Sequence, residues 1–260
     1  MNVKTMAEYF AEGKQPEVLF WVGSAGSYDD RAKKITKAFV KILNQANVAF
    51  AVLGTEESST GDAAKRAGNE FLFQMQAMMN IEILNGYEVK KIVTCDPHSF
   101  NTIKNEYPSL GGKYEVYHHT QFIQNLIDKG RLKIDDANLK GKRVTFHDPC
   151  YLGRANEVYE SPRDLIRRLG VNLTEMKRHK STALCCGAGG AQMFKDAEPG
   201  NKEVNVLRTE DALDTNPQII ATGCPYCNTM MTDGIKFKEK EDEIIVKDIA
   251  ELIAEANNLL

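Results

Sequence analysis

The 260-residue chain lacks several features that would assign it to a common functional class. No run approaches the ~18 consecutive apolar residues of a membrane-spanning helix, and residues 1–17 lack the apolar core of a signal peptide. The net charge of −3 gives no electrostatic attraction to nucleic acid. No glycine-rich nucleotide or flavin fingerprint is present. We therefore expect a cytoplasmic protein without its own membrane span, which reaches a membrane only through a partner.

Cysteine is scarce, with six residues, but five of them form one spaced set. Cys150 lies 35 positions before the adjacent pair Cys185 and Cys186, and Cys186 lies 38 positions before the CxxC pair Cys224 and Cys227. Thiolates are soft ligands that select zinc, copper(I) or iron–sulfur clusters. In a reducing compartment such a set is more typical of a metal or catalytic site than of disulfides.

The fifth thiol bears on the choice of metal. A four-thiolate zinc site needs one ligand fewer and rarely uses adjacent cysteines. The set therefore favours an iron–sulfur centre. The alternative is a non-catalytic interaction module that zinc holds together.

Short apolar runs alternate with amphipathic helical patterns along the chain, which predicts an α/β fold with mostly parallel sheets. The predicted strands are 18–23, 48–54, 90–94, 114–119, 142–148, 172–176 and 218–223. The predicted helices are 30–46, 63–84, 121–130, 161–170, 202–216 and 245–260. The polar segment 131–142 is interpreted as a linker or exposed excursion.

The two halves of the chain have similar spacings, which indicates an internal repeat. The interval of 34 positions from Ser24 to Ser58 corresponds to the 35 positions from Cys150 to Cys185. The interval of 36 positions from Ser59 to Cys95 corresponds to the 38 positions from Cys186 to Cys224. In this correspondence the first half has serines where the second has cysteines, and Cys95 alone remains.

The motifs HDPCYLGR, LCCGAGGAQMF and GCPYCNTMM resemble the cysteine-rich CCG domain. That domain is shared by heterodisulfide reductases and by the iron–sulfur subunits of glycolate and lactate oxidation systems. The resemblance covers nearly the whole chain as two tandem, pseudo-repeated α/β lobes, each with a mostly parallel sheet flanked by helices. Residues 1–140 would form a degenerate CCG lobe that lacks most cysteine ligands, and residues 141–260 a lobe with the complete motif.

The resemblance implies one iron–sulfur cluster in the second lobe, a non-cubane 4Fe–4S centre. Its ligands would be the five spaced cysteines, which are Cys150, Cys185, Cys186, Cys224 and Cys227. Ser24, Ser59 and Ser99 stand where related sequences can have cysteine, and a serine oxygen suits iron–sulfur poorly. We therefore expect no cluster in the first lobe. His147, three residues before Cys150, is a candidate to donate a hydrogen bond to cluster sulfur.

The family implies an iron–sulfur electron-transfer or redox subunit of a heterodisulfide-reductase-like or quinone-linked oxidoreductase complex. The expected partner is a larger iron–sulfur or flavin subunit that is linked to a membrane. Cys95 is expected to be a free core cysteine. Arg154, directly after CYLG, would either bind an anionic substrate or brace the loop.

Overall fold

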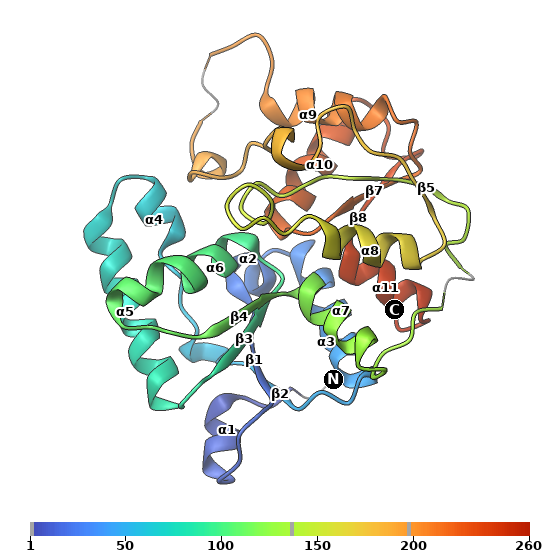
Figure 1. The fold of residues 1–260 in the computed structure, drawn as a ribbon. Coiled ribbons are helices and arrows are strands. Elements are labelled where there is room, and N and C mark those ends of the chain that lie inside the picture. Colours follow the sequence, from blue (N-terminus) through green and yellow to red (C-terminus); the bar gives the residue numbers. More distant parts are fainter. Residues whose placement is uncertain (1–2, 136–137, 197–198) are drawn as a thin grey trace.

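The computed structural model describes residues 3–135, 138–196 and 199–260, which form two lobes (Figure 1). Each lobe contains a four-stranded parallel sheet, in the order β2-β1-β3-β4 in the first and β6-β5-β7-β8 in the second. Because the strand order is the same in both halves, the α/β class and the tandem pseudo-repeat predicted from the sequence are confirmed.

The strands are short, and all but β8 lie close to the predicted positions. In the first lobe they are β1 (Val18–Trp21), β2 (Phe50–Ala51), β3 (Lys91–Thr94) and β4 (Glu115–His118). In the second lobe they are β5 (Arg143–Phe146), β6 (Asn172–Leu173), β7 (Ile219–Thr222) and β8 (Ile245–Asp248).

Helices cover the sheets. Those of the first lobe are α1 (Met6–Ala11), α2 (Gly23–Tyr28), α3 (Ala32–Gln45), α4 (Asp62–Arg66), α5 (Glu70–Gly86), α6 (Pro97–Asn101) and α7 (His119–Asp128). Those of the second lobe are α8 (Glu160–Arg168), α9 (Val204–Leu213), α10 (Pro225–Phe237) and α11 (Ile249–Ala256). No helix in the described ranges is long and apolar enough to cross a membrane.

Two predicted helices were wrong in extent. The predicted helix 63–84 is divided into α4 and α5, because Gly68 adopts a φ of +88° and Asn69 caps the Leu72 amide. The predicted helix 245–260 begins with strand β8, and α11 starts only after Asp248, whose side chain caps the Ala250 amide. Helix α10 begins inside the CxxC motif.

The two lobes share one hydrophobic core. Figure 1 shows α3, α7, α8 and α11 between the two sheets. Buried side chains from both lobes join in a single cluster, which includes Phe20, Phe39, Ile123, Phe146, Leu165 and Ile253. An ion pair also crosses between the lobes, since the Arg31 guanidinium donates to both Glu251 carboxylate oxygens at 2.8 and 2.7 Å.

The chemically informative turns all follow carboxyl ends of strands, where sites form in parallel sheets. Ser24 follows β1 and Asp96 follows β3 in the first lobe. Cys150 follows β5 and Cys224 follows β7 in the second. The strand order therefore brings two equivalent sets of turns together, one in each lobe.

Candidate metal centre

The second lobe brings the five spaced cysteines together. Cys224 is the N-cap residue of α10, and Cys227 lies in the first turn of that helix. Thiol contacts form an unbroken series, in the order Cys150, Cys185, Cys186, Cys227 and Cys224. Cys186, Cys224 and Cys227 are buried, whereas Cys150 and Cys185 are partly exposed.

Thiols this close cannot all ionise without a compensating cation. Hydrogen bonds with Cys150 and Cys186 and from the Gly187 amide lower the pKa of Cys185 well below its ordinary value. The resulting charge at Cys185, together with burial, raises the pKa of Cys150 and of Cys186. A positively charged metal centre removes this conflict, because metal-bound thiols are deprotonated. The donor set, five soft sulfurs in contact, fits an iron–sulfur cluster.

Gly187 makes the adjacent cysteine pair possible. Its φ of +96° lets the chain turn directly after Cys186. The turn brings the Gly187 amide to 3.3 Å from the Cys185 sulfur, to which it donates a hydrogen bond.

The tautomer of His147 follows from its neighbour Arg208. Burial and the positive charge of Arg208 lower the pKa of His147 to about 3, so the ring is neutral. The Arg208 Nε donates to His147 Nδ1 at 3.0 Å, and a guanidinium cannot accept. The remaining ring proton is therefore on Nε2, which has no hydrogen-bond partner among the described residues. A ring nitrogen of His147 lies within 4.8 Å of the Cys186 and Cys227 sulfurs.

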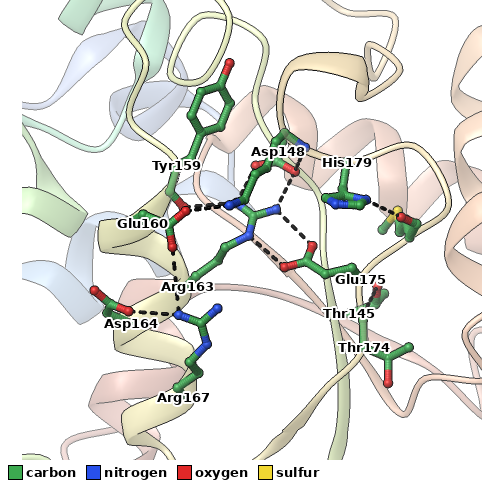
Figure 2. A network of polar contacts seen from close by, with 12 residues as sticks. Thr145, Asp148, Tyr159, Glu160, Arg163, Asp164, Arg167, Thr174, Glu175 and His179 are labelled. Atoms are coloured by element: carbon green, nitrogen blue, oxygen red, sulfur yellow. Dashed lines mark hydrogen bonds and ion pairs between the residues drawn. The ribbon is translucent and has the colours of Figure 1, made fainter.

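A buried ion-pair network fixes the turn that carries Cys150. The Arg163 guanidinium, fully buried, donates to both Asp148 oxygens at 2.7 and 2.8 Å and to both Glu175 oxygens at 2.7 and 2.9 Å (Figure 2). Burial alone would raise the pKa of Asp148, but the Arg163 hydrogen bonds hold it below its ordinary value. Asp148 Oδ2 also accepts from the Lys180 amide at 2.8 Å. The network thus ties the Cys150 turn to the segment that leads to Cys185.

Two further contacts position the cysteine loops. The Arg154 guanidinium donates a short hydrogen bond to the Ala183 carbonyl, so of its two predicted roles the structure supports bracing of the loop. His118 of the first lobe, through Nε2, hydrogen-bonds the Gly223 carbonyl at 2.9 Å, directly before Cys224.

The strand registers define the equivalent positions in the first lobe. Asp96 is an N-cap residue followed by proline, as Cys224 is, so Asp96 and not Cys95 corresponds to Cys224. By the same register Ser99 corresponds to Cys227. Cys95 lies in the shared apolar core at 5% exposure, where burial raises the pKa of its thiol.

Leu19 of β1 pairs with Ile92, and Thr145 of β5 pairs with the equivalent Ile220. Counting on from these two residues makes Ser24 the counterpart of Cys150. Trp21 is then the counterpart of His147. Spacing along the chain, which no strand pairing covers here, sets Ser58 and Ser59 opposite the adjacent pair Cys185 and Cys186. The five ligand positions of the first lobe therefore carry only oxygen side chains, which are Ser24, Ser58, Ser59, Asp96 and Ser99.

His98 was missed by the sequence interpretation, since no motif marks it. Its Nδ1 lies 2.9 Å from Asp62 Oδ2. Burial opposes its protonation, but the hydrogen bond to Asp62 and the charge of Asp96 raise the pKa of His98 to about 9. The ring packs between Tyr151 and Tyr226, at centroid distances of 4.5 and 5.4 Å. His98 thereby connects the first lobe to the cysteine site.

Comparison with known protein families shows to which family the chain belongs. The cysteine-rich domain family CCG matches residues 18–104 and 144–232, one copy in each lobe. The chain belongs to the CCG family.

Curated relatives match nearly the whole chain. The probable iron-sulfur-binding oxidoreductase FadF of Bacillus subtilis is 50% identical over 98% of this chain and 36% of its own length. The EtfAB:quinone oxidoreductase of Syntrophomonas wolfei is 43% identical over 98% of this chain and 36% of its own length. One subunit of the dihydromethanophenazine:CoB–CoM heterodisulfide reductase of Methanosarcina barkeri is 34% identical over 94% of this chain and 59% of its own length.

The chain therefore spans between about a third and three fifths of these relatives. Among solved structures, glutamate racemase RacE1 of Bacillus anthracis covers 93% of this chain and 79% of its own, with 13% identity and a TM-score of 0.36. That likeness is too low to inform the function.

We predict that Arg163→Met destabilises the protein by about 3–5 kcal/mol, because it leaves the Asp148 carboxylate buried without its partner. Arg167→Met is the matched control on the same helix, since Arg167 is largely exposed and pairs with Asp164 at the surface. It should cost no more than about 1 kcal/mol. Urea denaturation of both variants measures the difference. Equal losses would contradict the structural role given to the buried network.

Proposed function

We propose that this chain is an iron–sulfur electron-transfer or redox subunit of an oxidoreductase complex. The observation that carries the proposal is the series of five thiols in contact, one more than a zinc site uses. The names of FadF, the EtfAB:quinone oxidoreductase and the heterodisulfide reductase support it, since all three are redox proteins or their subunits.

A single cluster per chain fits the two lobes. The second lobe supplies five thiols, whereas the equivalent positions of the first supply four hydroxyls and a carboxylate. Oxygen side chains are hard ligands that suit iron–sulfur centres poorly. We infer a 4Fe–4S cluster of non-cubane type held by all five cysteines, with none in the first lobe.

Anaerobically reconstituted protein should therefore contain about four iron and four sulfide per chain. Cys186→Ser should lose or alter the visible spectrum, because a ligand is removed from a buried position. Cys95→Ser is the matched control, because Cys95 is also buried but packs in the shared apolar core and not among the five thiols, and it should keep the spectrum.

The same analysis tests the alternative. About eight iron per chain would show that the first lobe also holds a cluster. Four thiolates around zinc, without sulfide or colour, would support the non-catalytic interaction module instead. Equal bleaching by Cys95→Ser would show that the ligand set is wrongly assigned.

We further propose that His147 Nε2 donates a hydrogen bond to a sulfur of the cluster. Arg208 fixes the tautomer, so this nitrogen carries a proton and cannot bind iron. A donor to cluster sulfur stabilises the reduced, more electron-rich state and raises the reduction potential.

His147→Leu should lower the reduction potential by about 20–60 mV. This range is the equivalent of one hydrogen bond worth ~0.5–1.5 kcal/mol in a one-electron couple. His179→Leu is the control, because His179 Nδ1 is bonded to the Met176 carbonyl. A redox titration followed by visible absorption measures both. A higher potential in His147→Leu, or an equal shift in the control, would contradict the role.

The partner is proposed to be a larger iron–sulfur or flavin subunit linked to a membrane. One relative is named a probable membrane-anchored ferredoxin, 43% identical over 95% of this chain and 37% of its own length. A groove beside the partly exposed Cys185 suits such docking, since it brings a cluster ligand near the surface. The groove is lined by residues that include Met193, Lys195, Val204, Met230 and Asp233.

An anaerobic pull-down should recover the iron–sulfur or flavin subunit at near-equal stoichiometry. Val204→Asp, which puts a charge into the groove, should reduce recovery at least tenfold. Phe10→Asp is the control, because Phe10 is similarly exposed on α1 but lies outside the groove. Full quinone- or disulfide-reducing turnover by the chain alone would show that it is a self-sufficient enzyme.

A further inference from the structure

A cavity of about 100 Å³ occupies the site in the first lobe where the second lobe has its cysteines. All five oxygen-bearing counterparts of the cysteine ligands line it, which are Ser24, Ser58, Ser59, Asp96 and Ser99. A water needs about 10–15 Å³ of such volume, so the space admits a small organic molecule. The first lobe thus has a space at these positions that oxygen-bearing side chains line in place of thiols.

The cavity lies directly beside the thiols. Ala188 and Tyr226 line it and also pack against the buried cysteines. The 3₁₀ turn Gln192–Phe194 of the second lobe covers one side, next to α4 (Figure 1). Residues of both lobes therefore form the wall, and a bound molecule would lie within one side-chain layer of the cysteine site.

The hydrogen-bonding capacity that remains free in the wall is mainly donor capacity. Ser58 and Ser99 already donate their hydroxyl protons, to Asn80 Oδ1 and Asp96 Oδ2. The Ser59 hydroxyl accepts from the Gly61 amide, which leaves its own proton free to donate. The indole Nε1 of Trp21 is buried and has no partner among the described residues. Asp96 is already used, since it accepts from the His98 and Ser99 amides and from the Ser99 hydroxyl. Such a wall favours a ligand with oxygen acceptors.

The charges disfavour an anion. No lysine or arginine is among the described residues that line the cavity. Its one basic side chain, His98, is paired with Asp62. Ala63, Ala191, Met193 and Phe194 add apolar surface, which an uncharged ring can cover.

We propose that this cavity binds an uncharged, single-ring carbonyl compound such as a quinone ring, with the carbonyl oxygen accepting from the Ser24 and Ser59 hydroxyls and the Trp21 indole N–H. The site goes beyond the proposed cluster and requires no cluster for binding.

Trp21 is the only tryptophan in the chain, so its fluorescence reports on the cavity. The probe is duroquinone, whose ring is fully substituted and does not add to thiols. Titration into the reconstituted protein should quench Trp21 emission saturably. Equilibrium dialysis gives the bound fraction independently. Ser24→Ala should weaken binding two- to tenfold through loss of one hydrogen bond, and Ala63→Leu should abolish it by filling the cavity.

Ser27→Ala is the matched control, because Ser27 lies on α2 with Ser24 but does not line the cavity. Non-saturable quenching, or equal affinity in wild type and Ala63→Leu, would overturn the proposal. Displacement of duroquinone by pyruvate at a lower concentration would overturn the preference for an uncharged ligand. Iron analysis of the same samples separates this result from the proposed function, since binding without iron would contradict only the latter.

Discussion

Mutual repulsion among five closely packed thiolates is the constraint on which the rest of the second lobe depends. One negative charge can be stabilised at Cys185 by neighbouring thiols and the Gly187 amide, and each further charge then becomes costly. His98, whose pKa is raised to about 9, places a positive charge within 4.8 Å of the Cys224 sulfur, but it is shared with Asp62. One such charge does not balance five thiolates, and a metal centre would supply the rest. The buried Arg163 serves a different purpose, because its charge is used by Asp148 and Glu175 to fix the backbone before Cys150.

The two lobes share one backbone arrangement but carry different side chains at the ligand positions. The strand order, the proline after each N-cap residue and the positions of the turns are the same in both lobes. What differs is the set of side chains at five positions, and with it the class of ligand that the space can accept. Trp21 and His147 extend the parallel, since each places a ring N–H without a described partner at the same strand position.

Sequence reasoning predicted the two lobes, seven of the eight strands and the cysteine set, because these depend on local periodicity and on spacing along the chain. It misaligned Cys95 with Cys224, since a one-residue offset is visible only from the strand pairing and the cap of α6. It could not find His98 or the tautomer of His147. Both depend on contacts between segments 36 to 61 positions apart, for which no local pattern exists.

The shared core has a consequence for how much each lobe depends on the other for its stability. The side chains of α3, α7, α8 and α11 exclude water only when both lobes are present, so unfolding of one lobe exposes apolar surface of the other. The chain is thus one cooperative folding unit. Changes of side chains at the rim of the first lobe would leave that unit in place, whereas removal of the lobe would expose core side chains of the second lobe to water. The first lobe thus stabilises the lobe that carries the cysteines, whatever its own cavity binds.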